Sequence, residues 1–278
     1  MADVAQRTVV LTGASAGIGA AAAVELARRG HRLVLLGRDP AKLAAVVARV
    51  RDAGPIAPDV HVCDFARLTD VRRTGADIAA AYDVIDVLAN NAGLIAKARQ
   101  ETVDGHDLTI QVNHLAPYLL ATLLLDRLTA APAGRIVTTS SAAHVGGRLD
   151  PDDLDFRRRR WSRWRSYADS KQANILFTTE LAWRLRDTAV VPTCFHPGAV
   201  RSDFGDTTGL FRLAKKLSPI GFVTPSQGAS TLIALATEDG LAVPGGYFDA
   251  GRVARPTSRA IDPHLAARLW QVSADAVG

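Results

Sequence analysis

The chain has 278 residues, of which 48% are hydrophobic and 22% charged, with a formal net charge of +5. This apolar content is enough for a full core and excludes a disordered chain. The basic balance favours an acidic partner but does not require a nucleic acid. The length fits one large α/β domain or two small ones. We expect a single domain over residues 1–278, because no linker, repeat or low-complexity tract interrupts the chain.

Met1–Arg7 precede the first apolar run, so we expect no signal peptide. The longest strongly apolar stretch, Leu115–Leu125, ends at Asp126 and is too short to span a bilayer. These features predict a cytoplasmic protein without membrane attachment. Cys63 and Cys194 each lie in an apolar, β-rich run, which predicts two buried reduced thiols rather than a disulfide or a metal site.

Short β-branched runs alternate with Ala- and Leu-rich helical stretches from one end of the chain to the other. The first strand, Thr8–Thr12, leads through glycines into a helix that ends near Arg29, and Asp39-Pro40 is typical of the start of the next helix. This repeated βαβ order predicts an α/β fold with a doubly wound parallel sheet between two helical layers. The further expected strands are Leu33–Gly37, Val60–Cys63, Val84–Ala89, Arg135–Ser140, Ala189–His196 and an edge strand Gly246–Asp249, and the further helices include Leu68–Ala81, Gly105–Thr129 and Ala168–Arg186.

Two segments interrupt this alternation. Gly146–Ser166 is polar and Arg-rich, and Arg201–Pro225 is a long excursion with a short amphipathic stretch, Leu210–Leu217. Ligands of open α/β sheets bind beyond the carboxyl ends of the strands. Because both segments follow strand ends, we expect them to form the wall of a substrate site.

Glycines cluster between the first strand and the first helix, in Thr12–Gly19. Glycines permit a tight turn and let the backbone approach a pyrophosphate, which the N-terminus of the helix then stabilises. An ordinary βα turn is the alternative, but the order strand, glycines, helix at the start of a βαβ series favours a dinucleotide site. The expected contacts are Gly13, Ser15, Ala16, Gly17, Ile18 and Gly19.

Tyr167 and Lys171 are four residues apart, so both can project from one helical face into one site. A free phenol has a pKa of about 10 and is a poor acid–base group at neutral pH. A nearby ammonium favours the phenolate, so we expect Lys171 to lower the pKa of Tyr167. A surface tyrosine and a solvated lysine at this spacing are the alternative.

These patterns resemble the short-chain dehydrogenase/reductase family, and most closely its retinol-dehydrogenase-like branch, from Arg7 to about Val272. The resemblance implies a Rossmann-type fold and an oxidoreductase that moves a hydride between a nicotinamide cofactor and a carbonyl or alcohol. The matching stretches are Gly13–Gly19, Asn90–Gly93, Val112–Leu115, Ser140-Ser141, Tyr167 with Ser170–Asn174, His196–Arg201 and Ala267–Trp270.

The resemblance also implies roles for individual residues. Tyr167 would be the general acid or base, and Ser141 would orient the substrate oxygen while Ser140 faces the sheet. Lys171 would bind the nicotinamide ribose, and Asn113 would support a water that links this lysine to solvent. An Asn bonded to backbone and, at Asp64, a helix N-cap are the alternatives. The further expected cofactor contacts are Asp64, Phe65, Asn90, Ala92, Gly93, Tyr167, Lys171, Pro197, Gly198 and Val200.

Arg38 decides the expected cofactor. At the end of the second strand an acid would bind the 2′-hydroxyl of NAD, whereas Arg accommodates the 2′-phosphate of NADP. Asp39 follows, but its capping role before Pro40 accounts for it. We therefore predict NADP(H), with NAD(H) as the alternative. The apolar residues of Leu210–Leu217 predict a hydrophobic ketone, aldehyde or secondary alcohol, cyclic ones included, as the substrate.

Two other functions compete with this one. Trp161 and Trp164 alternate with arginines in Arg157–Arg165, a pattern that contacts phosphates and stacks on bases in some proteins. The segment is short, isolated and adjacent to Tyr167, which favours a solvated loop beside the substrate, so we expect no nucleic-acid partner. A cofactor sensor without turnover would need no acid, and the complete Ser, Tyr, Lys and Asn set argues against it. The seven histidines show no ligand spacing, which predicts no metal. Homo-oligomers are common in the family.

Overall fold

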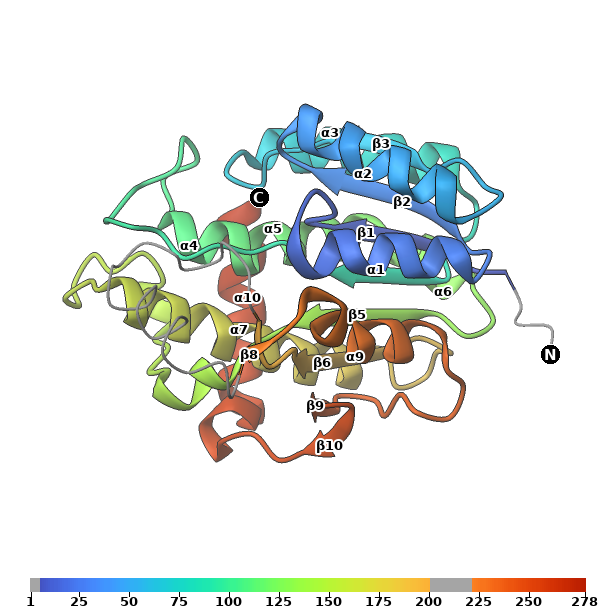
Figure 1. The fold of residues 1–278 in the computed structure, drawn as a ribbon. Helices are drawn as coiled ribbons and strands as arrows, with labels where there is room; N and C mark the ends of the chain where they lie inside the picture. The colour runs from blue at the N-terminus through green and yellow to red at the C-terminus, as the bar shows by residue number, and fades with distance from the viewer. Residues whose placement is uncertain (1–5, 201–221) are drawn as a thin grey trace.

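The computed structural model describes residues 6–200 and 222–278, and its largest feature is an eight-stranded sheet (Figure 1). The strand order is β10-β9-β6-β5-β4-β1-β2-β3, and every neighbouring pair is parallel except β9 and β10. The strands are β1 (Thr8–Thr12), β2 (Arg32–Gly37), β3 (Asp59–Val62), β4 (Val87–Asn90), β5 (Arg135–Thr139), β6 (Val191–His196), β9 (Tyr247–Asp249) and β10 (Arg252–Ala254). A short parallel pair stands apart from this sheet, β7 (Ala199–Val200) with β8 (Phe222–Val223).

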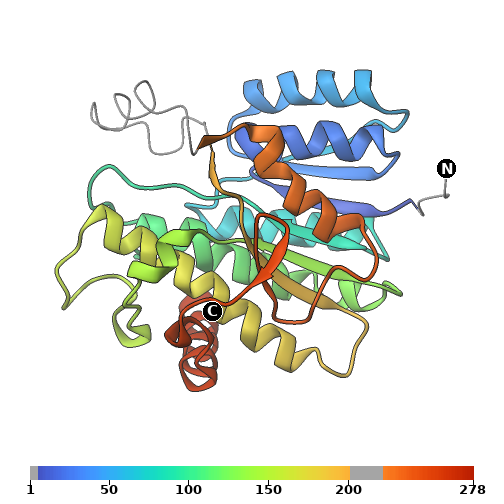
Figure 2. The same ribbon diagram turned by 60° about the horizontal axis from the view of Figure 1, so that its bottom comes forward.

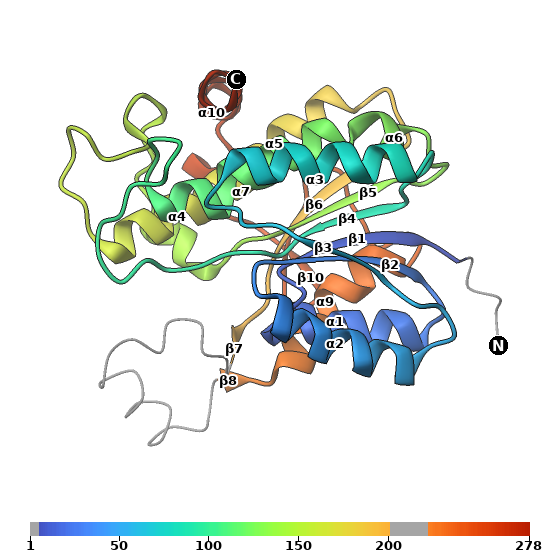
Figure 3. The same ribbon diagram turned by 90° about the horizontal axis from the view of Figure 1, so that it is seen from above.

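Helices cover both faces of the sheet (Figure 3). One layer contains α1 (Gly17–Arg28), α2 (Pro40–Ala53) and α9 (Pro225–Thr237). The other contains α3 (Leu68–Ala81), α5 (Ala116–Leu123), α6 (Leu125–Thr129) and α7 (Arg163–Arg184). The last helix, α10 (Pro263–Val277), lies outside α7 (Figure 2). The prediction of a doubly wound α/β fold with helices on both faces is therefore confirmed.

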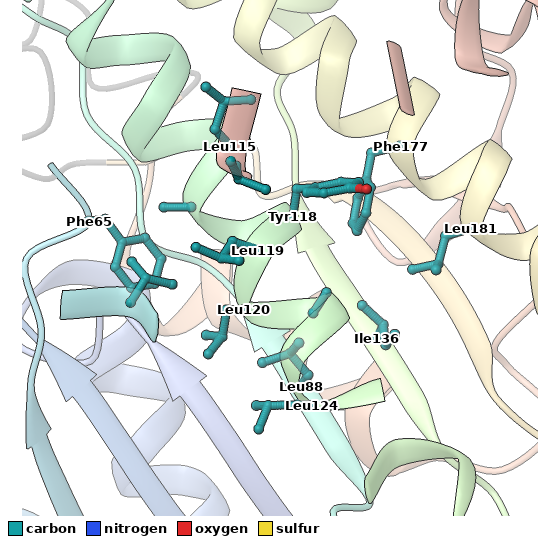
Figure 4. Packing of buried hydrophobic residues seen from close by; sticks show 14 of the residues in the cluster. Phe65, Leu88, Leu115, Tyr118, Leu119, Leu120, Leu124, Ile136, Phe177 and Leu181 are labelled. Carbon is teal, nitrogen blue, oxygen red and sulfur yellow. The ribbon is translucent and has the colours of Figure 1, made fainter. Parts of the chain in front are cut away.

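The strands are apolar at successive positions because both faces of the sheet are buried. In β1, Val9 belongs to the cluster beneath α1, α2 and α9, whereas Val10 belongs to the cluster beneath α3, α5 and α7. Figure 4 shows part of the second cluster, in which the rings of Tyr118 and Phe177 meet edge to face at 5.9 Å. Trp270 of α10 stacks on Phe177 from outside, with ring planes 9° apart. These aromatic contacts attach α10 to the helical layer.

The position predicted for the last strand is wrong. Gly246–Asp249 was expected at the edge of the sheet, but β9 pairs on both sides, with β6 and with β10. The chain turns back after β9 through Ala250 and Gly251, whose φ angles are +47° and +76°. The edge strand is therefore β10, and it is antiparallel to its neighbour.

The helix predicted over Gly105–Thr129 is broken into shorter pieces. A helical turn, α4 (Leu108–Ile110), starts at Asp107, whose carboxylate accepts two backbone N–H groups. The residues that follow, Gln111–Leu115, form a π-helical turn, and α5 and α6 complete the stretch. Single π-turns inside helices are rare and are often found at functional sites.

The helix predicted over Ala168–Arg186 starts earlier than expected. It begins at Arg163, because the Ser162 hydroxyl caps it by accepting the Arg165 N–H at 3.2 Å. Tyr167 and Lys171 therefore both lie within α7 rather than at its start.

The two cysteines are buried free thiols, as the sequence predicts. Burial raises the pKa of Cys63 to about 11 and that of Cys194 to about 12. In the part of the chain that the structure describes, no helix has the length and apolarity needed to cross a membrane.

Candidate active site

A cavity of about 520 Å³ opens at the carboxyl ends of β1, β4, β5 and β6. The strand order reverses between β1 and β4, which is the place where open α/β sheets bind their ligands. The volume lies within the usual range for small-molecule pockets. The lining residues come from six places along the chain: Gly13 with Ser15–Ile18, Asn91–Gly93, Thr139–Ser141, Tyr167 with Lys171, Pro197 with Gly198, and Pro225.

The glycine loop after β1 is packed so closely that there is no room for a side chain at Gly13 or at Gly19. A Cβ atom on Gly19 would lie 2.2 Å from the carbonyl oxygen of Gly13. Gly13 itself has a φ of +66°, and a Cβ atom there would lie 2.8 Å from the Cα atom of Ala92. Thr12 fastens this loop to the neighbouring turn, because its hydroxyl accepts the N–H groups of Asn91 and Ala92, each at 3.0 Å. The two turns therefore form one rigid wall of the cavity.

The N-terminus of α1 is open toward a ligand. Among the described residues no side chain caps it, and its first turn carries no acid. The first N–H groups of a helix lack internal partners, and an anion satisfies them well. Gly17 and Ile18, in this first turn, line the cavity. The glycine cradle and the uncapped helix together fit the pyrophosphate of a dinucleotide.

Three polar side chains meet at the other side of the cavity. Ser141 follows β5, and its hydroxyl is hydrogen-bonded to Tyr167 of α7, which is 8% exposed. The ammonium of Lys171 lies 5.6 Å from the centroid of the Tyr167 ring. It donates a 3.0 Å hydrogen bond to the carbonyl oxygen of Thr139, at the end of β5. Tyr167 and Lys171 face one site because they are one helical turn apart.

The lowered pKa that the sequence predicts for Tyr167 is not found in the protein by itself. Burial raises the pKa of Tyr167 to about 12, and the hydrogen bond to Ser141 opposes this only in part. Burial also lowers the pKa of Lys171 to about 8. Both groups are more than nine-tenths buried, and this loss of hydration is the largest cause of each shift. At neutral pH the phenol is therefore protonated and able to donate.

Asn113 stands behind the cavity rather than in its lining. Its amide donates to Ser170 Oγ at 2.9 Å and to the carbonyl of Leu94 at 3.0 Å, and it accepts the Leu94 N–H at 2.8 Å. A Cβ atom on Gly93 would lie 3.2 Å from Asn113 Oδ1 and 3.5 Å from Lys171 Nζ. The π-helical turn thus places the Asn113 amide close to Lys171. The bonds to the backbone of Leu94 are those expected from the alternative role, an asparagine bonded to backbone.

The residues predicted at the adenosine end lie outside this cavity. Arg38 is exposed at the end of β2. Asp39 caps α2 as predicted, since its carboxylate accepts the N–H groups of the second and third helical residues at 3.0 and 3.1 Å. Asp64 accepts the Ala66 N–H at 3.1 Å in the turn after β3. The Phe65 ring is buried in the cluster that Figure 4 shows.

Asn90, which the sequence predicts as a cofactor contact, is not among the residues that line the cavity. The side chain of Asn90 is buried, and its amide finds no hydrogen-bond partner among the described residues. The adjacent Asn91 lines the cavity and donates to the carbonyl oxygen of Thr12 at 3.0 Å. The residues that line the cavity but were not predicted are Asn91, Thr139, Ser140 and Pro225. Ser140 is buried and donates to the carbonyl oxygen of Lys171 at 2.7 Å.

The Arg-rich segment before α7 is only in part the solvated loop that the sequence predicts. The side chains of Arg157 and Arg158 are 55% and 66% exposed. Arg159 is 22% exposed and forms ion pairs with two buried carboxylates. Trp161 is partly buried and packs against the hydrophobic core, and its indole N–H donates to Asp107 at 2.8 Å.

Two remaining predictions concern residues that the structure describes only by their backbone or does not describe. The amphipathic stretch Leu210–Leu217 lies outside the described residues, and for Val200 only the backbone of β7 is described. Within residues 6–200 and 222–278, no group of His, Cys, Asp and Glu is arranged to hold a metal ion.

A protein-family model of short chain dehydrogenases matches residues 7–210. The fold, the site and this match show that the chain belongs to the short-chain dehydrogenase family of oxidoreductases, which act on alcohol and carbonyl groups of small molecules. Within the family the chain is retinol-dehydrogenase-like, as the resemblance implied. It is 38% identical to human retinol dehydrogenase 13 over all of its length and 86% of that protein. It is 45% identical to "Putative daunorubicin C-13 ketoreductase DnrU" of Streptomyces sp. (strain C5), over 98% of this chain and 93% of that one.

Solved structures agree with this assignment. A crystal structure of an uncharacterized protein from Mycobacterium paratuberculosis superposes with a TM-score of 0.80 at 35% identity, over 98% of this chain and 94% of that one. A short chain dehydrogenase from Escherichia coli CFT073, crystallised with NADPH, gives a TM-score of 0.69 at 27% identity, over 89% of this chain and 98% of that one.

Proposed function

We propose that the protein transfers a hydride between NADP(H) and a hydrophobic ketone, aldehyde or secondary alcohol. The observation that carries this proposal is that Ser141, Tyr167 and Lys171 line the same cavity as the glycine loop. The names of two relatives, a ketoreductase and a retinol dehydrogenase, support carbonyl or alcohol chemistry. The hydrophobic character of the substrate rests on the apolar residues of Leu210–Leu217.

The glycine loop and the N-terminus of α1 would hold the pyrophosphate, and the residues after β4 and β6 would border the nicotinamide half. Asp64 and the backbone of Phe65 would contact the adenine, and Lys171 the ribose next to the nicotinamide. When bound, the nicotinamide supplies or accepts the hydride. The residues after β4 and β6 that we propose as contacts of the nicotinamide half are Asn90, Ala92, Gly93, Pro197, Gly198 and Val200.

The chain's own side chains would handle the proton and the substrate oxygen. Tyr167 donates its proton to the oxygen of the carbonyl during reduction and takes it back during oxidation. Its pKa of about 12 keeps it protonated at neutral pH, which suits the reductive direction. The Ser141 hydroxyl holds the same oxygen, so one atom of the substrate meets both groups. Asn113 would support a water that connects Lys171 to solvent.

The direct test is a cofactor-oxidation assay over ketones and aldehydes, with the reverse assay over alcohols. We expect NADPH-dependent reduction of hydrophobic carbonyl compounds. Tight NADPH binding without turnover on any compound of these classes would favour the alternative of a cofactor sensor. Turnover that requires NADH instead would contradict the cofactor proposal alone.

The Arg38→Asp variant tests the cofactor proposal separately. We expect it to weaken NADPH binding by about 10- to 100-fold, because it removes a charge-assisted contact with the 2′-phosphate. NADH binding should change much less. The measurement is a fluorescence titration of both cofactors. Arg51→Asp, an equal charge change in the exposed last turn of α2, is the control. A wild-type protein that prefers NADH would contradict the proposal and point to Asp39.

A further inference from the structure

The segment between Ser141 and Tyr167 connects the two groups proposed to hold the substrate oxygen. We call residues 142–166 the linking segment. It leaves β5, folds back along the first turns of α7 and then continues into that helix (Figure 1). The end of β5 is also bonded directly to α7 through Ser140, Lys171 and Asn174. The contacts of the linking segment add to these bonds in placing Ser141 and Tyr167 relative to each other.

One side chain, Arg159, joins the linking segment to α7. Its Nε donates to Asp153 Oδ2 at 3.2 Å, and its Nη2 donates to the Asp153 carbonyl at 2.9 Å. Its Nη1 donates to Asp169 Oδ2 at 3.0 Å and to the Arg148 carbonyl at 2.7 Å. The guanidinium also lies 4.7 Å from the centroid of the Phe156 ring. Three separate parts of the chain are therefore held by one planar group, a geometry that suits Arg and not Lys.

The two carboxylates that Arg159 binds are buried. The side chains of Asp153 and Asp169 are 1% and 0% exposed. Asp153 also accepts the backbone N–H groups of the three residues from Arg157 on, and Asp169 accepts the Arg148 N–H at 2.7 Å. A buried charge is tolerated only with good partners, so this set of bonds strongly favours one arrangement.

Asp169 lies midway between Tyr167 and Lys171 in α7. Two residues correspond to about 200° around a helix, so its side chain leaves α7 on the side opposite to those two. The ion pair with Arg159 therefore attaches to α7 on the side opposite to Tyr167. Gln172 adds a second attachment, since its Oε1 accepts the Leu149 N–H at 3.1 Å.

We infer that Arg159 is a positioning residue that sets the geometry between Ser141 and Tyr167. This inference rests on the proposed function, because it concerns the substrate oxygen that these two groups share. The exposed arginines beside it do not have this role: Arg158 contacts Asp150 at 3.5 Å and the Asp152 carbonyl at 3.1 Å, both at the surface.

The test begins with Arg159→Lys, which keeps the charge and removes the planar fork. Misplacement by about 1 Å costs up to about 100-fold in rate, so we expect kcat to fall by about 10- to 100-fold. KM and the dissociation constant of NADPH should not change, since the glycine loop and the cavity lining do not include Arg159. The matched control, Arg158→Lys, should keep the wild-type kcat.

A double-mutant cycle with Ser141→Ala separates positioning from general destabilisation. If Arg159 acts through the geometry of Ser141, Arg159→Lys should cause little further loss of kcat in the Ser141→Ala background. Equal losses in both backgrounds, or a wild-type kcat in Arg159→Lys, would overturn the inference. If Arg159→Lys does not fold, as judged by NADPH binding, Asp169→Asn takes its place in the same cycle, because it leaves the contact with Asp153 intact. Absence of turnover in the wild type would overturn the proposed function together with this inference, whereas turnover with equal losses overturns the inference alone.

Discussion

Replacing Tyr167 by Phe is expected to reduce turnover by about 10²- to 10⁴-fold, the usual contribution of general acid–base catalysis. The substitution deletes the proposed proton donor and preserves the ring. The ring contacts remain available, namely the edge-to-face contact with Trp164 at 6.4 Å and the Lys171 ammonium at 5.6 Å from the ring centroid. The measurement is steady-state turnover on any accepted substrate, with NADPH affinity determined separately.

NADPH binding should survive in the Tyr167→Phe variant, because the glycine loop and α1 hold the phosphates in the proposal. The matched control is Tyr82→Phe, which removes a phenol hydroxyl that bonds to Asp59, outside the cavity lining. That variant should turn over like the wild type. Near-normal turnover in Tyr167→Phe would remove this residue from the chemistry and leave the mechanism without an acid.

Replacing Lys171 by Met is expected to abolish most turnover and yet to stabilise the protein without cofactor. Met keeps much of the apolar stem and removes the ammonium of Lys171, a residue that is 2% exposed. The Thr139 carbonyl keeps one donor, Asn174 Nδ2 at 3.0 Å. NADPH should bind more weakly, because the ammonium is the proposed ribose contact. The cause of the added stability is the burial that lowers the pKa of Lys171 to about 8.

The sign of the pH dependence follows from this lowered pKa. Between pH 8 and about 10.5 the unfolded chain holds a proton that the folded one has lost, so the free energy of unfolding rises with pH across this window. Below pH 8 both states are protonated and the full cost of burial is present, on the order of 3 kcal/mol. Lys171→Met should gain a stability of this order at pH 7 and lose the rise above pH 8.

Denaturant unfolding of wild type and variant without cofactor, from pH 7 to pH 10.5, measures this effect. Lys97→Met is the control, since Lys97 is exposed and its loss should leave both stability and pH dependence unchanged. A Lys171→Met protein that is less stable than the wild type at pH 7 would contradict the prediction, and it would mean that the ammonium stabilises the folded chain.

The sequence predicted those features that depend on neighbours along the chain. The strand–glycine–helix order located the glycine loop that lines the cavity, because only glycine fits where Gly13 and Gly19 approach other backbone atoms. The spacing of Tyr167 and Lys171 predicted their common face, because helical periodicity is local. Asp39 was expected as a cap and is one, since a capping carboxylate bonds to N–H groups two and three residues away.

Two further helices begin at local capping signals in the sequence. Thr224 and Gln227 form a capping box at the start of α9, and Asp262 before Pro263 starts α10, yet neither helix was among those named from the sequence. Both signals are short, and polar residues with proline are equally typical of turns. Such a capping signal identifies a helix only when the apolar face of the residues that follow is known to pack against another part of the protein.

The sequence by itself determined the α/β order, the glycine cradle, the Tyr and Lys pairing and the family, because each is written in residue type and spacing over a few turns of chain. Tertiary structure alone decided that β10 closes the sheet edge, that Asn91 rather than Asn90 meets the cavity, and that Arg159 is bound to buried acids. Tertiary structure also decided the direction of the pKa shift of Tyr167, which burial raises where the sequence predicted a lowered value. The physical reason is the same in each case: exposure to water and the partners of a polar group depend on what distant segments pack against it, and local pattern does not contain that information.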